Sequence, residues 1–281
     1  MKQLIINADD YGMSAGVNRG IVELLRSRVI SGTSVLTNMV EGAHLAELRA
    51  VVRDVGAGVG LHVNLSQGPA VNGPSSLTDS SGCFLERGEL VRRARRGKVC
   101  VGDIRQEVIA QIGRLAEAGM VPTHFDSHQH VSAIPQVFAV MLELARRYRV
   151  SMRPQRHYYV AAAKSSGHVL RRRPLVRAIA RTLDASSKLA GVRMARFVVE
   201  VDAAGWKTCE EHWKEAIRGL PLGVSEIFVH PGYLDERVSL LSRYAVQRER
   251  ELLVLKSLVG PLVCDSSVKL VSHRDAFGDR W

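Results

Sequence analysis

Four short apolar runs in this sequence each end in acidic residues or histidines. Each run has the length and the branched side chains of a buried strand. In parallel α/β folds, the carboxyl ends of the strands meet on one face, where ligands bind. We therefore expect carboxylates and imidazoles from distant segments to meet at one point. The residues concerned are Asp9, Asp10, His62, Asp126, His128 and His230.

Apolar runs alternate with segments of helical spacing along the whole chain. Residues 17–29 place apolar side chains at Val17, Ile21, Leu24 and Leu25, which is typical of an amphipathic helix. Further helices are predicted at 43–52, 104–117, 137–147, 175–189, 209–218 and 244–258. Strands are predicted at 4–10, 34–36, 59–65, 123–126, 150–153, 197–199, 224–229 and 269–272. Seven or eight strand–helix units without a break in composition predict one α/β, barrel-like domain over residues 1–281.

Two irregular segments are too long for ordinary strand-to-helix loops. Residues 66–88 are rich in Gly, Ser, Pro and Asn, and residues 156–174 include Tyr158 and Tyr159. Long loops at the strand-end face often bind or cover substrates, and tyrosine rings can pack on sugar faces. Our hypothesis is that both insertions select the substrate. The alternative is that both are plain surface loops.

The charge of the chain is strongly positive. The formal net charge is +11, and much of the excess lies at 92–98 and 171–173. The simplest interpretation is a set of solvated helix faces. The alternative is peripheral contact with an anionic surface such as a membrane or nucleic acid. Neither cluster is interleaved with aromatic residues, which make up only 5% of the chain, and this argues against sequence-specific nucleic-acid recognition.

The cysteines and the first residues bear on the compartment. The four cysteines form no C-x-x-C pair, so we predict neither a disulfide framework nor a structural zinc site. The first residues lack a signal-peptide pattern, and no apolar run approaches the roughly 20 residues of a membrane span. We expect a cytoplasmic protein without a transmembrane segment, and a homodimer stays open.

The adjacent Asp9 and Asp10 directly follow the first predicted strand. Two neighbouring carboxylates repel each other and need a cation or hydrogen-bond donors. The alternative is that one of them caps the next helix, but that helix is predicted to start several residues later, near Ser14. One Asp and two His can hold a divalent ion with room left for water and substrate. The remaining Asp can then accept a proton.

Three histidines lie within seven residues around the third apolar run. His124, His128 and His130 surround Asp126. Such a cluster is costly to place in a fold without a metal or a proton-transfer task. Asp126 could orient an imidazole that binds the metal.

Other candidates follow separate strands. His62 lies on the same strand face as Asn64. A lone histidine in such a place is more often a core residue. Considered together with Asp9, Asp10 and the histidine run, however, His62 indicates a metal ligand. His230 follows a strand and precedes a turn, where an acid for the leaving amine should lie; the alternative is a turn histidine without a role. Arg153, at another strand end, either pairs with the spare aspartate or is a plain surface arginine.

Together these motifs resemble the YdjC-like carbohydrate deacetylases, a family that includes chitooligosaccharide deacetylases and hopanoid-associated glycolipid deacetylases. The resemblance extends from about residue 2 to about residue 260. It rests on Asn7-Ala8-Asp9-Asp10-Tyr11-Gly12, Gly60-Leu61-His62, Thr123-His124-Phe125-Asp126-Ser127-His128-Gln129-His130 and His230-Pro231-Gly232.

The resemblance implies a distorted (β/α) TIM-like barrel, one divalent metal ion (magnesium or zinc) and removal of acetyl groups from N-acetylated sugars. Asp9 matches the family's catalytic base and His230 a site histidine, and the metal ligands match Asp10, His62 and His128. Family members often carry a further histidine where this chain reads Val131-Ser132-Ala133, so the outer wall of the site differs. We expect five further residues to contact the substrate or orient the ligands: Asn64, Asp126, His130, Arg153 and Tyr158.

The leading interpretation is a metal-dependent hydrolase acting on N-acetylated amino sugars of the chitooligosaccharide type. A second enzymatic interpretation is a deacetylase of an N-acetylglucosaminyl glycolipid, which the two basic segments favour. A third, from another class, is a nucleic-acid or membrane-surface binding protein with a vestigial site. The intact set of Asp and His residues argues against the third.

Overall fold

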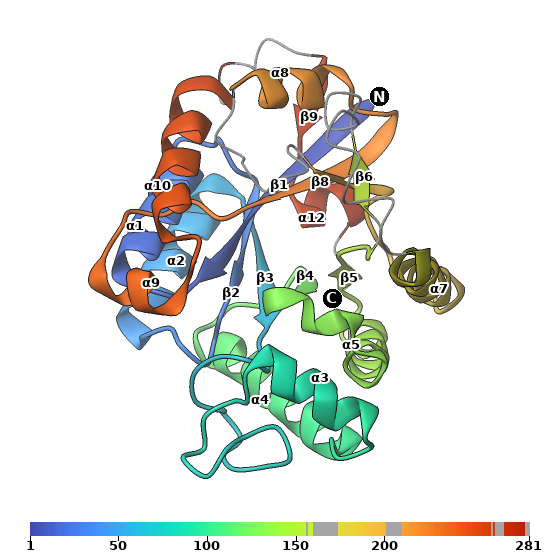
Figure 1. Ribbon diagram of the computed structural model, residues 1–281. Helices are drawn as coiled ribbons and strands as arrows, with labels where there is room; N and C mark the ends of the chain where they lie inside the picture. The colour runs from blue at the N-terminus through green and yellow to red at the C-terminus, as the bar shows by residue number, and fades with distance from the viewer. Residues whose placement is uncertain (156, 160–173, 201–209, 260, 262–266, 279–281) are drawn as a thin grey trace.

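The computed structural model describes residues 1–155, 157–159, 174–200, 210–259, 261 and 267–278. At its centre lies a curled sheet of parallel strands surrounded by helices (Figure 1). The strands are β1 (Lys2–Tyr11), β2 (Gly32–Val35), β3 (Gly58–Val63), β4 (His124–Ser127), β5 (Ser151–Met152), β6 (His157–Tyr159), β7 (Phe197–Glu200), β8 (Gly223–Val229) and β9 (Val268–Leu270).

The order of the strands defines an open barrel. The main path runs β5-β4-β3-β2-β1-β8-β7-β6, and β9 pairs with the start of β1. Every strand pair along this path is parallel. β5 and β6 follow each other in the chain but lie at opposite ends of the path, and among the described residues no pairing joins them. The predicted distorted (β/α) barrel is therefore confirmed, with its opening between β5 and β6.

β1 is the central strand of the sheet. Leu4, Ile5 and Ile6 are completely buried, so both faces of the strand are covered, and this explains its continuous apolar run. β8 pairs along one edge of β1 from Lys2 to Ala8. On the other edge β9 pairs with the first residues of the strand and β2 with the last ones. The backbone of β1 is thus paired with neighbouring strands on both edges, and this fixes the strand that leads into the site.

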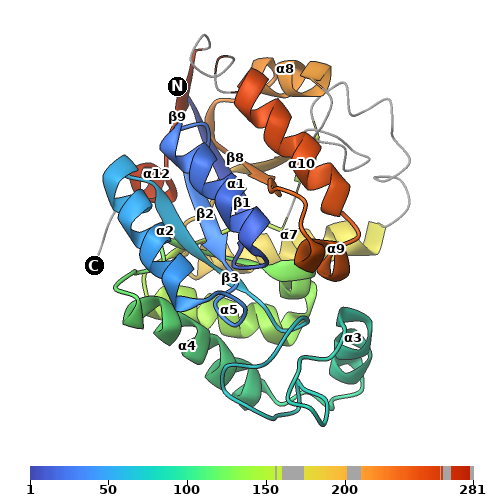
Figure 2. The same cartoon turned by 90° about the vertical axis from the view of Figure 1, so that its left-hand side faces the viewer.

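Helices connect the strands and cover the outside of the sheet. Figure 2 shows α1, α2 and α10 over one side of it. No helix in the described ranges combines the length and the apolar character that a membrane span requires. The helices are α1 (Ala15–Arg26), α2 (Gly42–Val55), α3 (Arg87–Arg95), α4 (Val101–Glu117), α5 (Pro135–Arg147), α7 (Pro174–Leu189), α8 (Glu210–Arg218), α9 (Glu236–Leu241), α10 (Ala245–Val254) and α12 (His273–Phe277), with short turns η1 (His128–Ala133) and η3 (Leu255–Val259).

Among the described residues, the periodicity did not predict the short turn η1 or the elements α3, α9, α12 and β6. α3 buries only Leu90 and Ala94 among its arginines, so its apolar period is weak, and the other three elements are short. The prediction that 156–174 is irregular was wrong for β6 and for the first residue of α7, while residues 156 and 160–173 lie outside the described part. In the other insertion, 66–86 is irregular and α3 begins at Arg87.

Candidate active site

Asp10, His62 and His128 meet at the carboxyl ends of β1, β3 and β4. Asp10 Oδ1 lies 3.2 Å from His62 Nε2 and 2.8 Å from His128 Nδ1. All three side chains are buried. Asp10 has a left-handed backbone (φ 72°) at an irregularity in the pairing of β1 with β2, a conformation that aspartate adopts more readily than most residues. The structure therefore brings the three predicted metal ligands together.

The spacing of these ligand atoms fits a divalent ion. Two ligands that each lie about 2.1 Å from one ion, at angles of about 90–110°, are about 3.0–3.4 Å apart. The three ligand atoms all lie within 4.8 Å of one another, and the shortest separations are 2.8 and 3.2 Å. A carboxylate and two imidazoles form an open ligand set, which leaves positions for water or substrate.

The far side of each imidazole ring is also fixed. His62 Nδ1 lies 2.7 Å from Asp126 Oδ1, so the ring presents Nε2 to the centre. Gln67 donates from its amide nitrogen to the Leu241 carbonyl oxygen and offers Oε1 to His128 Nε2 at 3.0 Å. His128 therefore carries a proton on Nε2, and the Nδ1 lone pair points at a carboxylate. That arrangement requires a cation or a second proton between the two atoms, which supports a metal site.

Asp9 lies in a different environment, next to a buried arginine. Arg153 NH1 and NH2 donate to the two oxygens of Asp9 at 2.6 and 2.8 Å, and Asn7 donates to Oδ1 at 2.8 Å. The same guanidinium contacts Asp126 Oδ2 at 2.7 Å and Glu226 Oε1 at 2.6 Å. Arg153 thus joins three carboxylates and fixes the orientation of Asp9.

These contacts determine the charges of the site. Burial alone raises the pKa of Asp9, but the Arg153 guanidinium outweighs it and holds the pKa well below its usual range. Burial likewise opposes the ionisation of Asp10, whereas His128 and Arg248 hold its pKa well below the usual range. Burial lowers the pKa of His62, but Asp126 and Asp10 outweigh burial and raise this pKa to about 10. Without a metal, His62 is therefore an imidazolium that donates to both carboxylates.

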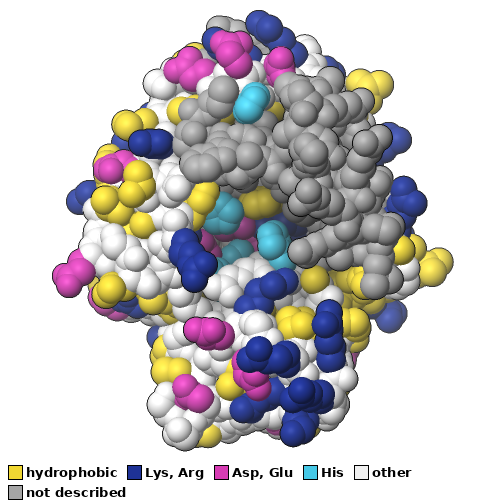
Figure 3. All heavy atoms as spheres, in the orientation of Figure 1, with side chains coloured by type: hydrophobic (Ala, Val, Ile, Leu, Met, Phe, Trp, Pro, Cys, Tyr) yellow, Lys and Arg dark blue, Asp and Glu magenta, His cyan; other side chains and the backbone are white. Residues whose placement is uncertain are grey.

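His230 directly follows β8 (Gly223–Val229). Its half-buried ring packs edge-on against Phe228 and Tyr244, with centroid distances of 5.6 and 5.8 Å. The imidazole contributes to the lowered pKa of Asp9, so the two groups interact electrostatically. Figure 3 shows histidine and acidic side chains at the bottom of a hollow in this face of the molecule.

Three predicted residues lie outside this cluster. Asn64 is buried, but it shapes the following loop by accepting hydrogen bonds from the Ser66 and Gln67 amides. His130 is exposed, and its ring lies 6.2 Å from that of Phe228. The backbone of Tyr158 belongs to β6, whereas its side chain lies outside the described part. The alternative that Asp9 or Asp10 caps the next helix was wrong, because Ser14 is the N-cap of α1.

Three site residues were missed from the sequence: Gln67, Glu226 and Arg248. Glu226 lies inside an apolar strand, and Arg248 shares the buried face of α10 with Ala245 and Leu252. A charged residue within an apolar stripe could have indicated both. Gln67 carries no such signal, because it lies in an irregular loop.

The fold and this site define an open (β/α) barrel with a candidate metal centre at the carboxyl edge of its sheet. Residues 3–259 match the family model for YdjC-like proteins. The chain belongs to this family, so the resemblance seen in the motifs is confirmed.

Relatives match the chain along nearly its whole length. The carbohydrate deacetylase of Geobacillus stearothermophilus is 33% identical over 275 residues, which cover 97% of each chain. The chitooligosaccharide deacetylase of Yersinia pestis (strain Pestoides F) is 30% identical over 278 residues, which cover 98% of this chain and 99% of the relative.

A solved structure shares the fold. A protein from Enterococcus faecalis V583, provisionally described as a cellobiose-phosphate cleavage protein, superposes with a TM-score of 0.74 at 24% identity. The superposition covers 97% of this chain and 98% of that protein. The curled parallel sheet is thus common to both chains.

Proposed function

We propose that this chain is a metal-dependent hydrolase that removes acetyl groups from N-acetylated amino sugars. The observation that carries the proposal is the buried Asp10, His62 and His128 group with Asp9 beside it. The family membership and the names of the relatives, carbohydrate deacetylase and chitooligosaccharide deacetylase, support the choice of reaction.

The proposed mechanism assigns each residue one task. Asp10, His62 and His128 would hold the ion, and their two imidazoles favour zinc over magnesium. When bound, such an ion polarises an amide carbonyl and activates water. Asp9 accepts the proton of the attacking water, and its lowered pKa keeps it ionised at neutral pH.

The leaving group is the amine of the sugar. His230 donates a proton to the amide nitrogen as the C–N bond breaks, so the products are acetate and a free amino sugar. Arg153 holds Asp9 in place through two hydrogen bonds. The reaction needs no co-reactant besides water.

An acetate-release assay tests the proposal. The protein is stripped with a chelator, reloaded with zinc or magnesium, and supplied with acetylated chitooligosaccharides of increasing length. We expect acetate and free amine in equal amounts, only after reloading. A preparation that binds an ion but releases no acetate from any N-acetylated sugar would contradict the proposed reaction.

The insertion at 66–88 is proposed to select the substrate. Gln67, near its start, contacts the ligand His128, so this end of the segment borders the metal site. The rest is folded back on itself through two isolated bridges, Pro69 with Cys83 and Thr78 with Phe84. Shortening 75–82 should change the relative rates on short and long sugars while metal affinity stays constant. An equal loss on all substrates would remove the loop from substrate selection.

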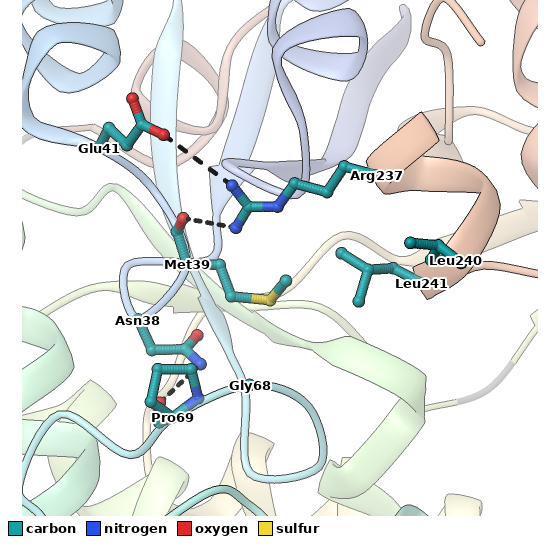
Figure 4. A pocket seen from close by; sticks show the side chains of 8 residues that line it. All are labelled: Asn38, Met39, Glu41, Gly68, Pro69, Arg237, Leu240 and Leu241. Carbon is teal, nitrogen blue, oxygen red and sulfur yellow. Dashed lines mark hydrogen bonds and ion pairs between the residues drawn. The ribbon is translucent and has the colours of Figure 1, made fainter. Parts of the chain in front are cut away.

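A pocket beside Gln67 favours the second candidate, a glycolipid substrate. The pocket has a volume of about 440 Å³ and is lined by Asn38, Met39, Glu41, Gly68, Pro69, Arg237, Leu240 and Leu241. Figure 4 shows that its polar side chains contact their neighbours: Asn38 donates to Pro69, and Arg237 contacts Glu41 and the Met39 carbonyl oxygen. What remains is an aliphatic lining, which suits an alkyl group joined to the sugar.

The comparison of a methyl and an octyl glycoside of N-acetylglucosamine tests this candidate. Leu240 is 81% exposed, so Leu240→Ser is expected to fold normally. If the pocket takes the alkyl chain, the wild type prefers the octyl glycoside and the variant loses that preference by about tenfold, the effect of removing a few buried methylene groups. Equal rates on both glycosides in the wild type would leave the oligosaccharide as the substrate.

The basic segment at 92–98 is the second feature that favours a glycolipid. Arg92 and Arg93 donate to Glu89 on α3, while Arg95 and Lys98 are exposed. Lys and Arg side chains gather over the lower part of the face in Figure 3, where α3 lies in Figure 1. Contact with an anionic membrane is tested by cosedimentation with vesicles containing phosphatidylglycerol at rising salt.

A further inference from the structure

Arg248 is the residue of α10 that reaches the candidate metal centre. Its side chain is only 3% exposed, and its NH2 group lies 2.5 Å from Asp10 Oδ2. We infer that Arg248 is a positioning residue that makes Asp10 bind the ion through Oδ1 alone and adds a positive charge beside that ion. This inference rests on the metal-dependent function proposed above.

The two oxygens of Asp10 have different partners. Oδ1 faces His62 Nε2 and His128 Nδ1, whereas Oδ2 is bound by Arg248. A carboxylate with two free oxygens can bind a cation through both of them. A strong charge-assisted hydrogen bond to Oδ2 competes with that second contact, so the geometry favours coordination through one oxygen.

The charge of Arg248 also acts on the ion. One carboxylate and two neutral imidazoles carry a charge of −1, and the guanidinium offsets it. Because like charges repel across this short distance, Arg248 weakens the binding of a divalent ion. A bound ion would therefore keep more of its positive charge for polarising a substrate carbonyl. Arg153 differs, since its charge is already offset by three carboxylates.

The packing of α10 holds Arg248 at this position. The backbone carbonyl oxygen of Arg248 accepts a hydrogen bond from the Gly232 amide at 3.3 Å. Gly232 in turn packs so closely against α1 that a Cβ on Gly20 would lie 3.0 Å from its Cα. Within the described chain, Arg248 Nε and NH1 have no hydrogen-bond partner. Among the described residues, this buried guanidinium therefore binds Asp10 and not the scaffold.

Metal affinity separates this role from a structural one. Arg248→Gln removes the charge, and Arg250→Gln removes the same charge from an exposed position on the same helix. The dissociation constant for zinc is measured by competition with a chromophoric chelator at constant pH and salt. We expect it to fall on the order of tenfold in Arg248→Gln, because the repulsion is relieved, and to stay unchanged in Arg250→Gln. If Arg248 merely oriented Asp10, its loss would instead raise the zinc dissociation constant, since loss of such a partner weakens metal binding by about 10–100-fold.

The outcomes are distinct. A zinc dissociation constant that is unchanged or higher in Arg248→Gln overturns the inference. If this variant does not fold, a wild-type crystal structure with zinc decides: contact of both Asp10 oxygens with the ion overturns the inference, and contact of Oδ1 alone, with Arg248 still on Oδ2, supports it. A wild-type protein that binds no divalent ion would overturn the proposed function and the inference with it.

Discussion

Asp9 and Asp10 are neighbours in the chain, yet they belong to two regions of the site with opposite chemistry. Asp10 faces the imidazoles of His62 and His128, which can share an ion with it. Asp9 is bound by Arg153 through both oxygens, so a fixed cation already occupies its immediate surroundings. We propose Asp10 as a metal ligand and Asp9 as a proton acceptor, because Arg153 contacts both oxygens of Asp9, whereas Arg248 contacts only Oδ2 of Asp10 and leaves Oδ1 facing the imidazoles.

The second candidate metal group shows the same contrast. Asp9, His62 and Asp126 also have ligand atoms within 4.8 Å of one another. The guanidinium of Arg153 contacts both of these aspartates at 2.6–2.8 Å. An arginine is always charged, so an ion bound here would have to displace the guanidinium from both carboxylates. Arg248, in contrast, contacts only Oδ2 of Asp10 and leaves Oδ1 facing the imidazoles. We therefore propose the Asp10 group as the site of the ion.

The largest expected effect is on the Asp10 region. Asp10→Ala removes a charged ligand, so zinc affinity should fall by more than the roughly 100-fold that the loss of an outer partner costs, and turnover should fall with it. Asp54→Ala, at an exposed position on α2, is the matched control. Metal content by elemental analysis and acetate release are measured on the same samples. Normal metal binding by Asp10→Ala would contradict the ligand assignment.

The second effect concerns the Asp9 region. Asp9→Asn keeps the shape of the side chain and removes the proton acceptor, so kcat should fall by about 10²–10⁴-fold. Zinc affinity should stay within a few-fold of wild type, as measured by the same competition assay. If Asp9→Asn instead loses the metal while its circular dichroism spectrum is intact, the roles of the two aspartates are reversed.

His230 tests whether the Asp9 region has an acid partner. His230→Ala should lower kcat by about 10²-fold, because the leaving amine is no longer protonated. The loss should be much smaller on an activated anilide, whose leaving group needs less protonation. His130→Ala, at an exposed position, serves as the comparison. Near wild-type activity of His230→Ala on the sugar would remove this residue from the mechanism.

The smallest effect is a dependence of metal binding on pH. The pKa of metal-free His62 is raised to about 10, so at pH 8 an ion must displace a proton from this ring. Zinc affinity should rise by about tenfold per pH unit as pH approaches 10. Calorimetry in two buffers of different ionisation enthalpy should detect about one released proton at pH 8. Absence of proton release would contradict the imidazolium form of His62.

The raised pKa of His62 also determines how the folding stability of the metal-free protein changes with pH. Because the pKa of His62 is higher in the folded, metal-free protein than in the unfolded chain, its contribution is fully present below about pH 6.5. The contribution is lost as pH rises through the folded value of about 10. The melting temperature of chelator-treated protein should therefore decline over this window more in the wild type than in His62→Phe.

The sequence predicted the elements whose apolar period is long and unbroken. β1 and α1 were found from a continuous apolar run and from helical spacing, because burial imposes these patterns directly. α3 and α9 were missed, since an arginine-rich helix and a helix of six residues show too little period. At the site, the residue types at four strand ends predicted that carboxylates and imidazoles meet at one point, and the resemblance to the family singled out Asp10, His62 and His128 among them.

What the sequence by itself determined is therefore the alternation of strands and helices, the chemistry carried at the strand ends and the family. The tertiary structure decided which cation each aspartate meets. Arg248 reaches Asp10 across 238 positions of the chain, and Arg153 reaches Asp9 across 144. Such pairs depend on how α10 packs on α1 and on how far the sheet curls, and no local pattern of side chains encodes either quantity.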